Sequence, residues 1–194
     1  MSAEGDPTAA RPLLYLDVDG PLNPFAAKPH RRPEGYETHR MLPDTWIAQH
    51  GGKPYWRVKP LRVWLNPAHG PALSALTDRF ELVWATTWQH DANTHIGPKL
   101  GLPELPVVEW QNTNRVGPDG TFFKTAELVQ HAAGRPFAWI DDDLSTPDRL
   151  YVEREHAGAA LLHWVDPAKG LLDDDFDALA AWADSQGDTT PTAA

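Results

Sequence analysis

The sequence contains no cysteine among its 194 residues. This absence excludes disulfide bonds and thiolate metal sites, and it fits a reducing compartment. The chain also has no apolar run long enough to cross a bilayer, and Met1 to Arg11 lack the hydrophobic segment of a secretory signal. From the sequence we therefore expect a cytoplasmic protein without a membrane partner.

Positive charge is scarce, because 17 Lys and Arg residues stand against 27 Asp and Glu residues and give a formal net charge of −10. Proteins that bind nucleic acids generally do so through clustered Lys and Arg, so we expect no general nucleic-acid-binding surface. The nine histidines include no HExxH pair, and His90 and His95 are five residues apart, so they face differently on a helix. These patterns do not favour a zinc site.

The length suffices for one domain with its own core, and strand and helix patterns alternate along it. We expect a single domain at residues 12–185 between disordered tails at residues 1–11 and 186–194, which are rich in Pro, Thr, Ala and Gly. Expected strands cover 13–18, 80–86, 106–110, 137–141 and 159–165, and expected helices cover 71–79, 91–100, 125–133, 147–156 and 172–183. The alternation predicts an α/β fold with a mostly parallel, five-stranded sheet covered on both faces.

Residues 21–70 interrupt this alternation and hold many Pro, His and Arg residues. Two aromatic stretches, 55–58 and 62–65, resemble short strands around Lys59 and Pro60. We interpret the segment as a small β-rich flap inserted after the first strand, because an ordered loop of this length usually has a function. Its basic side chains are candidates for recognition of a second anion: Arg31, Arg32, His39, Arg40 and Arg57.

Three expected strands end in polar residues suited to phosphoryl-transfer chemistry. They are Leu13–Leu16 before Asp17 and Asp19, Leu82–Ala85 before Thr86 and Thr87, and Phe137–Ile140 before Asp141, Asp142 and Asp143. If these strands are parallel neighbours, their carboxyl ends lie together at the edge where open α/β sheets bind ligands. We therefore expect these residues to form one site.

Each acidic motif also has a simpler explanation. Asp17 and Asp19 are two residues apart and so point the same way on an extended backbone, while Gly20 permits a sharp exit. An ordinary Asp-Gly turn would show the same pattern. The acidic triplet at 141–143 could belong to a helix-capping loop, although Ser145 or Thr146 is better placed for that role.

Taken together, the acidic residues imply a cation. Two like charges ~4 Å apart cost about 4 kcal/mol at an effective dielectric constant near 20. A cluster of Asp17, Asp19, Asp141 and Asp142 therefore requires a divalent cation, raised pKa values, or both. A set of carboxylate and other oxygen ligands favours Mg²⁺, whose coordination substrate phosphate can complete.

With these motifs the chain resembles the haloacid dehalogenase (HAD) superfamily of phosphohydrolases over about residues 13–165. Residues 16–20 match the first motif of that superfamily, an aspartate followed two residues later by a second aspartate. Thr86 is similar to the second motif, Lys124 to the third, and residues 140–142 to the fourth. The resemblance implies a three-layer αβα, Rossmann-like fold with Asp17 at the tip of the central strand.

The resemblance also implies catalytic roles. Asp17 would attack phosphorus and form an aspartyl-phosphate, and Asp19 would protonate the leaving oxygen and then deprotonate water. Thr86 would donate a hydrogen bond to the phosphoryl group, and Lys124 would offset negative charge. Lys99 is a possible substitute for Lys124.

Metal-binding and substrate-binding residues follow from the same resemblance. Mg²⁺ would be held by Asp17, by the backbone carbonyl of Asp19 and by Asp142, with Asp141 as the second choice in the triplet. The phosphoryl group would lie near Gly20, Thr86, Thr87 and Trp88. Thr87 competes with Thr86 for the second-motif role.

We therefore expect a Mg²⁺-dependent phosphatase that acts on a phosphomonoester. Neither inserted segment is large enough for a cap with its own core, so the resemblance implies a capless or minimally capped member. An open site would admit a phosphorylated metabolite or macromolecule. The alternatives are a non-catalytic module that binds phosphate or metal, and phosphoryl transfer to an acceptor other than water. Dehalogenation is disfavoured because it needs no Mg²⁺ and gives the second aspartate no role.

Overall fold

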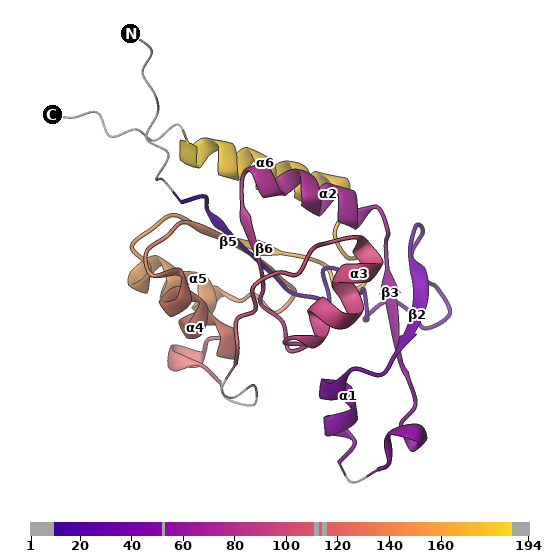
Figure 1. The fold of residues 1–194 in the computed structure, drawn as a ribbon. Coiled ribbons are helices and arrows are strands. Elements are labelled where there is room, and N and C mark those ends of the chain that lie inside the picture. The colour runs from indigo at the N-terminus through magenta and orange to yellow at the C-terminus, as the bar shows by residue number, and fades with distance from the viewer. Residues whose placement is uncertain (1–9, 52, 111–112, 114–115, 188–194) are drawn as a thin grey trace, which may run out of the picture.

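A computed structural model describes residues 10–51, 53–110, 113 and 116–187 (Figure 1). The tails expected at 1–11 and 186–194 lie mostly outside these residues. The strands are β1 (Leu13–Leu16), β2 (Glu37–Met41), β3 (Leu61–Leu65), β4 (Glu81–Trp84), β5 (Phe137–Asp141) and β6 (Ala160–Trp164). The α-helices are α1 (Asp44–Gln49), α2 (His69–Ala75), α3 (Gly97–Leu100), α4 (Phe123–Ala132), α5 (Thr146–Glu155) and α6 (Asp173–Gly187). Within this described part, no helix is long and apolar enough to span a bilayer.

The main sheet has the strand order β4-β1-β5-β6, and all its strand pairs are parallel. β1 lies between β4 and β5, with Leu16 paired to Trp84 on one side and to Ile140 on the other. The three strands therefore end at the same level. The predicted α/β architecture with a mostly parallel sheet is confirmed, and so is the expectation that these strand ends meet.

The expected strand at 106–110 is reduced to a single bridge, so the described sheet has four strands where five were predicted. Val107 bridges Trp84, with one hydrogen bond on each side: Trp84 N–H donates to Pro106 O and Val108 N–H donates to Trp84 O. Pro106 itself has no N–H to extend the ladder. Beyond Val108 the chain turns to the site, where the Trp110 indole binds the Thr86 carbonyl.

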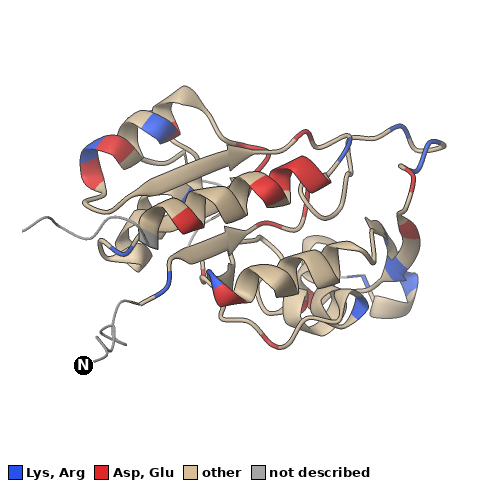
Figure 2. Cartoon of the chain, turned by 90° about the horizontal axis from the view of Figure 1, so that it is seen from above, with Lys and Arg blue, Asp and Glu red and all other residues tan. Residues whose placement is uncertain are grey.

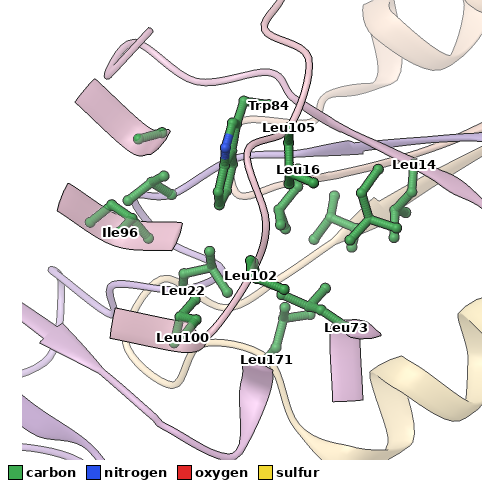
Figure 3. Packing of buried hydrophobic residues seen from close by; sticks show 14 of the residues in the cluster. Leu14, Leu16, Leu22, Leu73, Trp84, Ile96, Leu100, Leu102, Leu105 and Leu171 are labelled. Carbon is green, nitrogen blue, oxygen red and sulfur yellow. The ribbon is translucent and has the colours of Figure 1, made fainter. Parts of the chain in front are cut away.

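Helices cover both faces of the sheet, with α2 and α6 on one side and α4 and α5 on the other (Figure 1). Alternate residues of each central strand enter opposite cores, because successive side chains in a strand point to opposite faces. Leu14 and Leu16 pack in the larger cluster, together with Trp84 and Leu73 (Figure 3). Leu13 and Tyr15 pack in the other cluster. Burial on both faces explains the continuous apolar run before Asp17.

The flap at 21–70 is β-rich only in part. β2 and β3 pair antiparallel, whereas Tyr55–Arg57, predicted as a strand, forms a 3₁₀ helix. Pro54 before it and Pro60 after it remove backbone donors that a ladder would need. The short helix α1 lies between β2 and β3 in the chain, and together with them it extends away from the main sheet (Figure 1). The remaining short elements are a 3₁₀ helix at Leu76–Asp78, a π-helix at Ala92–Ile96 and a 3₁₀ helix at Pro118–Gly120.

Candidate active site

Asp17 is the first residue after β1 and lies between the tips of β4 and β5. Its N–H donates to Ile140 O at 3.2 Å, and the neighbouring Ala85 N–H donates to Leu16 O at 2.9 Å, so parallel pairing continues to this level. The Asp17 side chain is buried, and its Oδ1 accepts the Val18 N–H at 2.7 Å. The sheet therefore fixes the Asp17 carboxylate at the centre of its carboxyl edge.

Lys124 in the first turn of α4 reaches this carboxylate from the side. Its Nζ lies 2.7 Å from Asp17 Oδ2 and 2.7 Å from Asp141 Oδ2, and the side chain is 1% exposed. Burial alone would lower the pKa of Lys124, but Asp141 and Asp17 outweigh that effect and raise the pKa above its ordinary value. The ammonium therefore stays charged. Lys99, the alternative in the sequence, is exposed on α3.

Asp141 is fully buried at the end of β5 and has a large set of donors. Its Oδ2 accepts Lys124 and the Trp139 indole N–H, the latter at 3.1 Å, and its Oδ1 accepts the Asp143 N–H at 3.0 Å. A carboxylate with these partners is held rigidly. Within the site, Asp141 contacts Lys124 and positions the Lys124 ammonium against Asp17.

Asp142 completes an acidic cluster with Asp17 and Asp141. One oxygen of each residue lies within 4.8 Å of the other two. Burial is the main reason that the pKa values of Asp17 and Asp142 both rise to about 7, and Asp141 adds to each shift. When ionised, the three carboxylates carry −3, and Lys124 neutralises only one of these charges. The remaining −2 matches a divalent cation.

Gly20 explains how Asp142 approaches the first motif so closely. A Cβ at Gly20 would lie 2.3 Å from Asp142 Oδ1, and the backbone φ of Gly20 is +90°. Both features require glycine at this position. The turn after Asp19 therefore leaves room for the Asp142 carboxylate, and this is the role that the geometry gives to Gly20.

Asp19 is half-buried and faces a cavity beside the acidic cluster. Its Oδ1 accepts the Asn23 side-chain amide at 2.7 Å, and its Oδ2 accepts the Trp88 indole N–H at 2.9 Å. Burial raises the pKa of Asp19, while the hydrogen bonds from Asn23 and Trp88 oppose that rise. The two donors fix the orientation of a carboxyl group that holds its proton more tightly than an exposed aspartate does.

Thr86 and Thr87 follow β4 but differ in position. Thr86 is fully buried, and its Oγ1 accepts the Trp88 N–H at 3.3 Å while its carbonyl accepts the Trp110 indole at 2.8 Å. Thr87 is exposed and lines the cavity that Asp19 faces. Trp88 is buried and lines that cavity too, so its indole contributes both a wall and the donor to Asp19.

The acidic triplet is not the cap of α5. Ser145 is the N-cap residue and forms a capping box with Asp148, whose Oδ2 accepts the Ser145 N–H at 2.8 Å. Asp148 is buried and also accepts Thr125 Oγ1 at 2.6 Å, which joins α5 to α4. The helix start is therefore satisfied without Asp141, Asp142 or Asp143.

The family of the chain follows from comparison with known proteins. The model of a family described as "HAD domain in Swiss Army Knife RNA repair proteins" matches residues 13–176. The chain belongs to this family. The expected membership of the HAD superfamily is thereby confirmed, and the acidic cluster of this HAD domain lies at the tips of its β1 and β5. Searches among curated proteins and among solved structures gave no match.

The residues of this HAD domain fit the divalent cation that the superfamily implies. The oxygen donors are hard ligands, they lie close enough to share one ion, and they retain uncompensated negative charge after pairing with Lys124. Asp17 and Asp142 are the better candidates for side-chain ligands, because the oxygens of Asp141 already accept three hydrogen bonds.

Asn23 is a site residue of the HAD domain that sequence reasoning missed. Besides donating to Asp19, it accepts the Trp64 N–H at 3.0 Å and so links Asp19 to strand β3 of the flap. Its position four residues after Asp19, in a Pro-rich loop, gave one weak signal, because Asn is common in turns. Its partner in β3 is 41 residues away in the sequence, so this contact had no local pattern.

Proposed function

We propose that this HAD domain is a Mg²⁺-dependent phosphomonoesterase with Asp17 as its nucleophile. The observation that carries the proposal is the placement of the Asp17 carboxylate at the tip of β1, held by Lys124 at 2.7 Å, beside the hydrogen-bonded Asp19. Carboxylate nucleophiles form acyl-phosphate intermediates, and a neighbouring acid assists departure of the leaving group.

In the first step, an oxygen of ionised Asp17 attacks phosphorus, and the bond from phosphorus to the ester oxygen breaks. Asp19 transfers its proton to that leaving oxygen. The raised pKa of Asp19 supports this role, because the group must be protonated before the reaction. The product of this step is an alcohol and an aspartyl-phosphate on Asp17.

In the second step, water attacks phosphorus of the aspartyl-phosphate. Asp19, now ionised, takes a proton from this water, and the bond between phosphorus and the Asp17 oxygen breaks. Asp17 returns as a carboxylate, and inorganic phosphate is released. The hydrogen bonds from Asn23 and Trp88 hold the Asp19 carboxylate in its ionised form between the two steps.

The other residues offset charge. Lys124 remains an ammonium beside Asp17 throughout, and Thr86, buried just after β4, donates its hydroxyl to a phosphoryl oxygen in the proposed reaction. Mg²⁺, held by Asp17, Asp142 and the Asp19 carbonyl, would reduce the repulsion between the acidic cluster and an anionic substrate.

The family description suggests which substrates to test. It names RNA repair proteins, so the terminal phosphate of an RNA strand is a candidate beside small phosphomonoesters. Such a phosphate is itself a monoester, and the same two steps would remove it.

The test is Mg²⁺-dependent release of phenolate from an aryl phosphate by the wild-type and Asp17→Asn proteins. We expect turnover that requires Mg²⁺ and falls by at least about a thousandfold in Asp17→Asn. Asp184→Asn, which removes an exposed charge paired with Arg79, is the control and should behave like wild type. Equal turnover in Asp17→Asn would refute the proposal, and a phosphorylated acceptor in place of free phosphate would indicate phosphoryl transfer.

A further inference from the structure

The cavity beside Asp19 is the space into which a leaving group would extend. It has a volume of about 560 Å³, and its lining includes Asp19, Thr87 and Trp88 from the site. The flap supplies much of the remaining lining, including Trp46 from α1 and Arg62 from β3. Because Asp19 protonates the leaving oxygen in the proposed reaction, the rest of the substrate must occupy this cavity. The volume is typical of a site for a small organic ligand.

The Trp46 indole is fixed at this cavity. Its Nε1 donates to Lys59 O at 2.9 Å, and its ring lies 4.5 Å from the His50 ring, centroid to centroid. Helix α1 has no buried residue, yet Thr45 ties it to the core because its backbone N and its Oγ1 donate to Asp91 Oδ2 at 2.8 and 2.7 Å. An aromatic surface is thus held in place without being covered by the core.

Two arginines of the β2–β3 pair have no salt-bridge partner within the described residues, and one of them lines the cavity. Arg62, which lines the cavity, is paired directly across the β2–β3 ladder with Arg40. Like charges in such cross-strand positions destabilise a sheet, and neither arginine forms a salt bridge within the described residues. Arg62 instead donates to Pro29 O at 3.1 Å and lies 4.0 Å from the Trp64 ring centroid. An anionic ligand would relieve the repulsion.

The charge of the chain is strongly segregated. Residues 21–70 hold eight of the 17 Lys and Arg residues and only three of the 27 Asp and Glu residues, so the flap carries +5 while the rest carries −15. Figure 2 shows several blue segments on the right of the view, on the side where the flap lies. The expectation of no general nucleic-acid surface came from the net charge of the whole chain. A local basic flap is compatible with that expectation.

We propose that the cavity binds the terminal nucleotide of an RNA strand, which carries the phosphate to be removed. Trp46 provides the face on which the terminal base stacks, and Arg62 and Arg40 contact the next phosphodiester of the strand. Stacking on an aromatic side chain tolerates any base, so the site selects a strand end and not a sequence. This inference rests on the proposed function, because it assigns the leaving group of that reaction.

The aromatic wall and the paired arginines together favour this occupant over a simple aryl phosphate. An uncharged aryl group would fill the apolar part of the cavity but would leave Arg40 and Arg62 opposed. A strand end supplies both a flat base and a second anion at a distance from the scissile phosphate. The aromatic wall of the cavity and the arginine pair on β2 and β3 then have one explanation.

Turnover tests the proposal with hexaribonucleotides that carry a 5′-phosphate or a 3′-phosphate, compared with a nucleoside monophosphate and an aryl phosphate. We expect kcat/KM for at least one hexamer to exceed both small substrates by at least tenfold. In Trp46→Ala, the ratio of kcat/KM for the hexamer to that for the aryl phosphate should fall about fivefold or more, and Trp46→Phe should restore it. Trp56→Ala, which removes an indole 71% exposed elsewhere on the flap, is the control.

The salt dependence of KM for the hexamer tests whether Arg62 and Arg40 contact a phosphodiester. Each contact between a cation and a single-stranded phosphate contributes a slope of about 0.7 to the dependence of log KM on log salt concentration. Arg62→Gln and Arg40→Gln should each reduce the slope for the hexamer by about that amount. An unchanged slope, or a hexamer no better than the mononucleotide, would overturn the proposal.

Binding separates this inference from the proposed function. Asp17→Asn should bind the phosphorylated hexamer in fluorescence anisotropy, and adding Trp46→Ala should weaken binding about fivefold or more. If the aryl phosphate is hydrolysed in an Asp17-dependent reaction but Trp46→Ala affects neither binding nor the substrate ratio, the inference fails and the phosphatase stands. If nothing is hydrolysed but Trp46-dependent binding persists, the phosphatase fails and the strand-end site stands.

Discussion

The side-chain amide of Asn23 donates to Asp19 at 2.7 Å while its oxygen accepts the Trp64 N–H of the flap. The flap and the proposed acid–base group are therefore parts of one hydrogen-bonded unit. A change in the position of β3 would change the hydrogen bonding of Asp19, so substrate contacts on the flap can influence the reactivity of the site.

Replacement of Asn23 by Ala should alter the pH dependence of the reaction. Loss of its hydrogen bond removes a group that stabilises ionised Asp19, so the pKa of Asp19 should rise. Because Asp19 must be protonated for the first step, the alkaline limb of the kcat/KM profile should move to higher pH by about one unit. A shift of this size corresponds to the free energy that one hydrogen bond to a charged group contributes. Asn66→Ala is the control. The Asn66 side chain accepts the Ala68 N–H, so its loss should leave the pH profile of kcat/KM unchanged.

Lys124 should be essential for stability as well as chemistry. Lys124→Met leaves Asp17 and Asp141 buried and unpaired, which costs about 3–5 kcal/mol in comparable sites. We expect the melting temperature to fall by about 10 °C, and part of the loss to be recovered at low pH, where Asp17 is protonated. Lys99→Met removes the exposed alternative and should change the free energy of unfolding by less than about 0.5 kcal/mol. Equal effects of the two substitutions would contradict the assignment.

The site residues at strand tips could be predicted because their signals are local. An apolar run of four or five residues followed by carboxylates or hydroxyls identifies both the strand and its end. The proximity of Asp17, Thr86 and Asp141 at one edge of the sheet then follows from the register of the parallel strands. Lys124 could be predicted only through the resemblance, because a lysine at a helix start shows nothing locally of its two partners.

The flap could not be predicted to the same degree. β2 reads Glu-Thr-His-Arg-Met, a polar stretch that becomes a strand only through pairing with β3 twenty residues later. Tyr55–Arg57 has the aromatic content of a strand, but its flanking prolines favour a turn of 3₁₀ helix. In both cases tertiary contacts and backbone restrictions outweigh side-chain propensity.

The metal-free protein should become less stable as the pH rises. The pKa values of Asp17 and Asp142 are about 7 in the folded state, above the ordinary aspartate value that applies after unfolding. Between about pH 4 and 7 the folded state therefore binds more protons, and the free energy of unfolding falls with increasing pH. Thermal unfolding with a chelator should show this trend. Mg²⁺ should stabilise the protein more at pH 8 than at pH 5, since its ligands must be ionised.

An Asp142→Asn variant is the matched control for this pH dependence. Removing one of the two titrating carboxyls should flatten the loss of stability in the chelator and reduce the response to Mg²⁺. A pH profile identical to that of wild type would show that Asp142 does not titrate in this range.

Substitutions of Thr86 and of Thr87 should affect different kinetic constants. Thr86→Val keeps the shape of a fully buried side chain but removes the hydroxyl proposed to bind the phosphoryl group, so kcat should fall by about tenfold to a hundredfold for an aryl phosphate. Thr87 lines the leaving-group cavity, so Thr87→Val should act mainly on KM. A larger loss of kcat in Thr87→Val would exchange their roles.

Gly20→Ala should weaken metal binding although it replaces none of the proposed metal ligands. The new Cβ would overlap Asp142 Oδ1 and force that carboxylate away from Asp17, so the Mg²⁺ concentration for half-maximal activity should rise at least about tenfold. Gly134→Ala is the control for the backbone strain of a non-glycine residue at positive φ. Gly134 has a φ of +84°, and a Cβ added there would have no atom within 4 Å. Both variants should lose similar stability in a chelator, but only Gly20→Ala should lose stabilisation by Mg²⁺. If Gly134→Ala loses as much, backbone strain and not Asp142 is the cause.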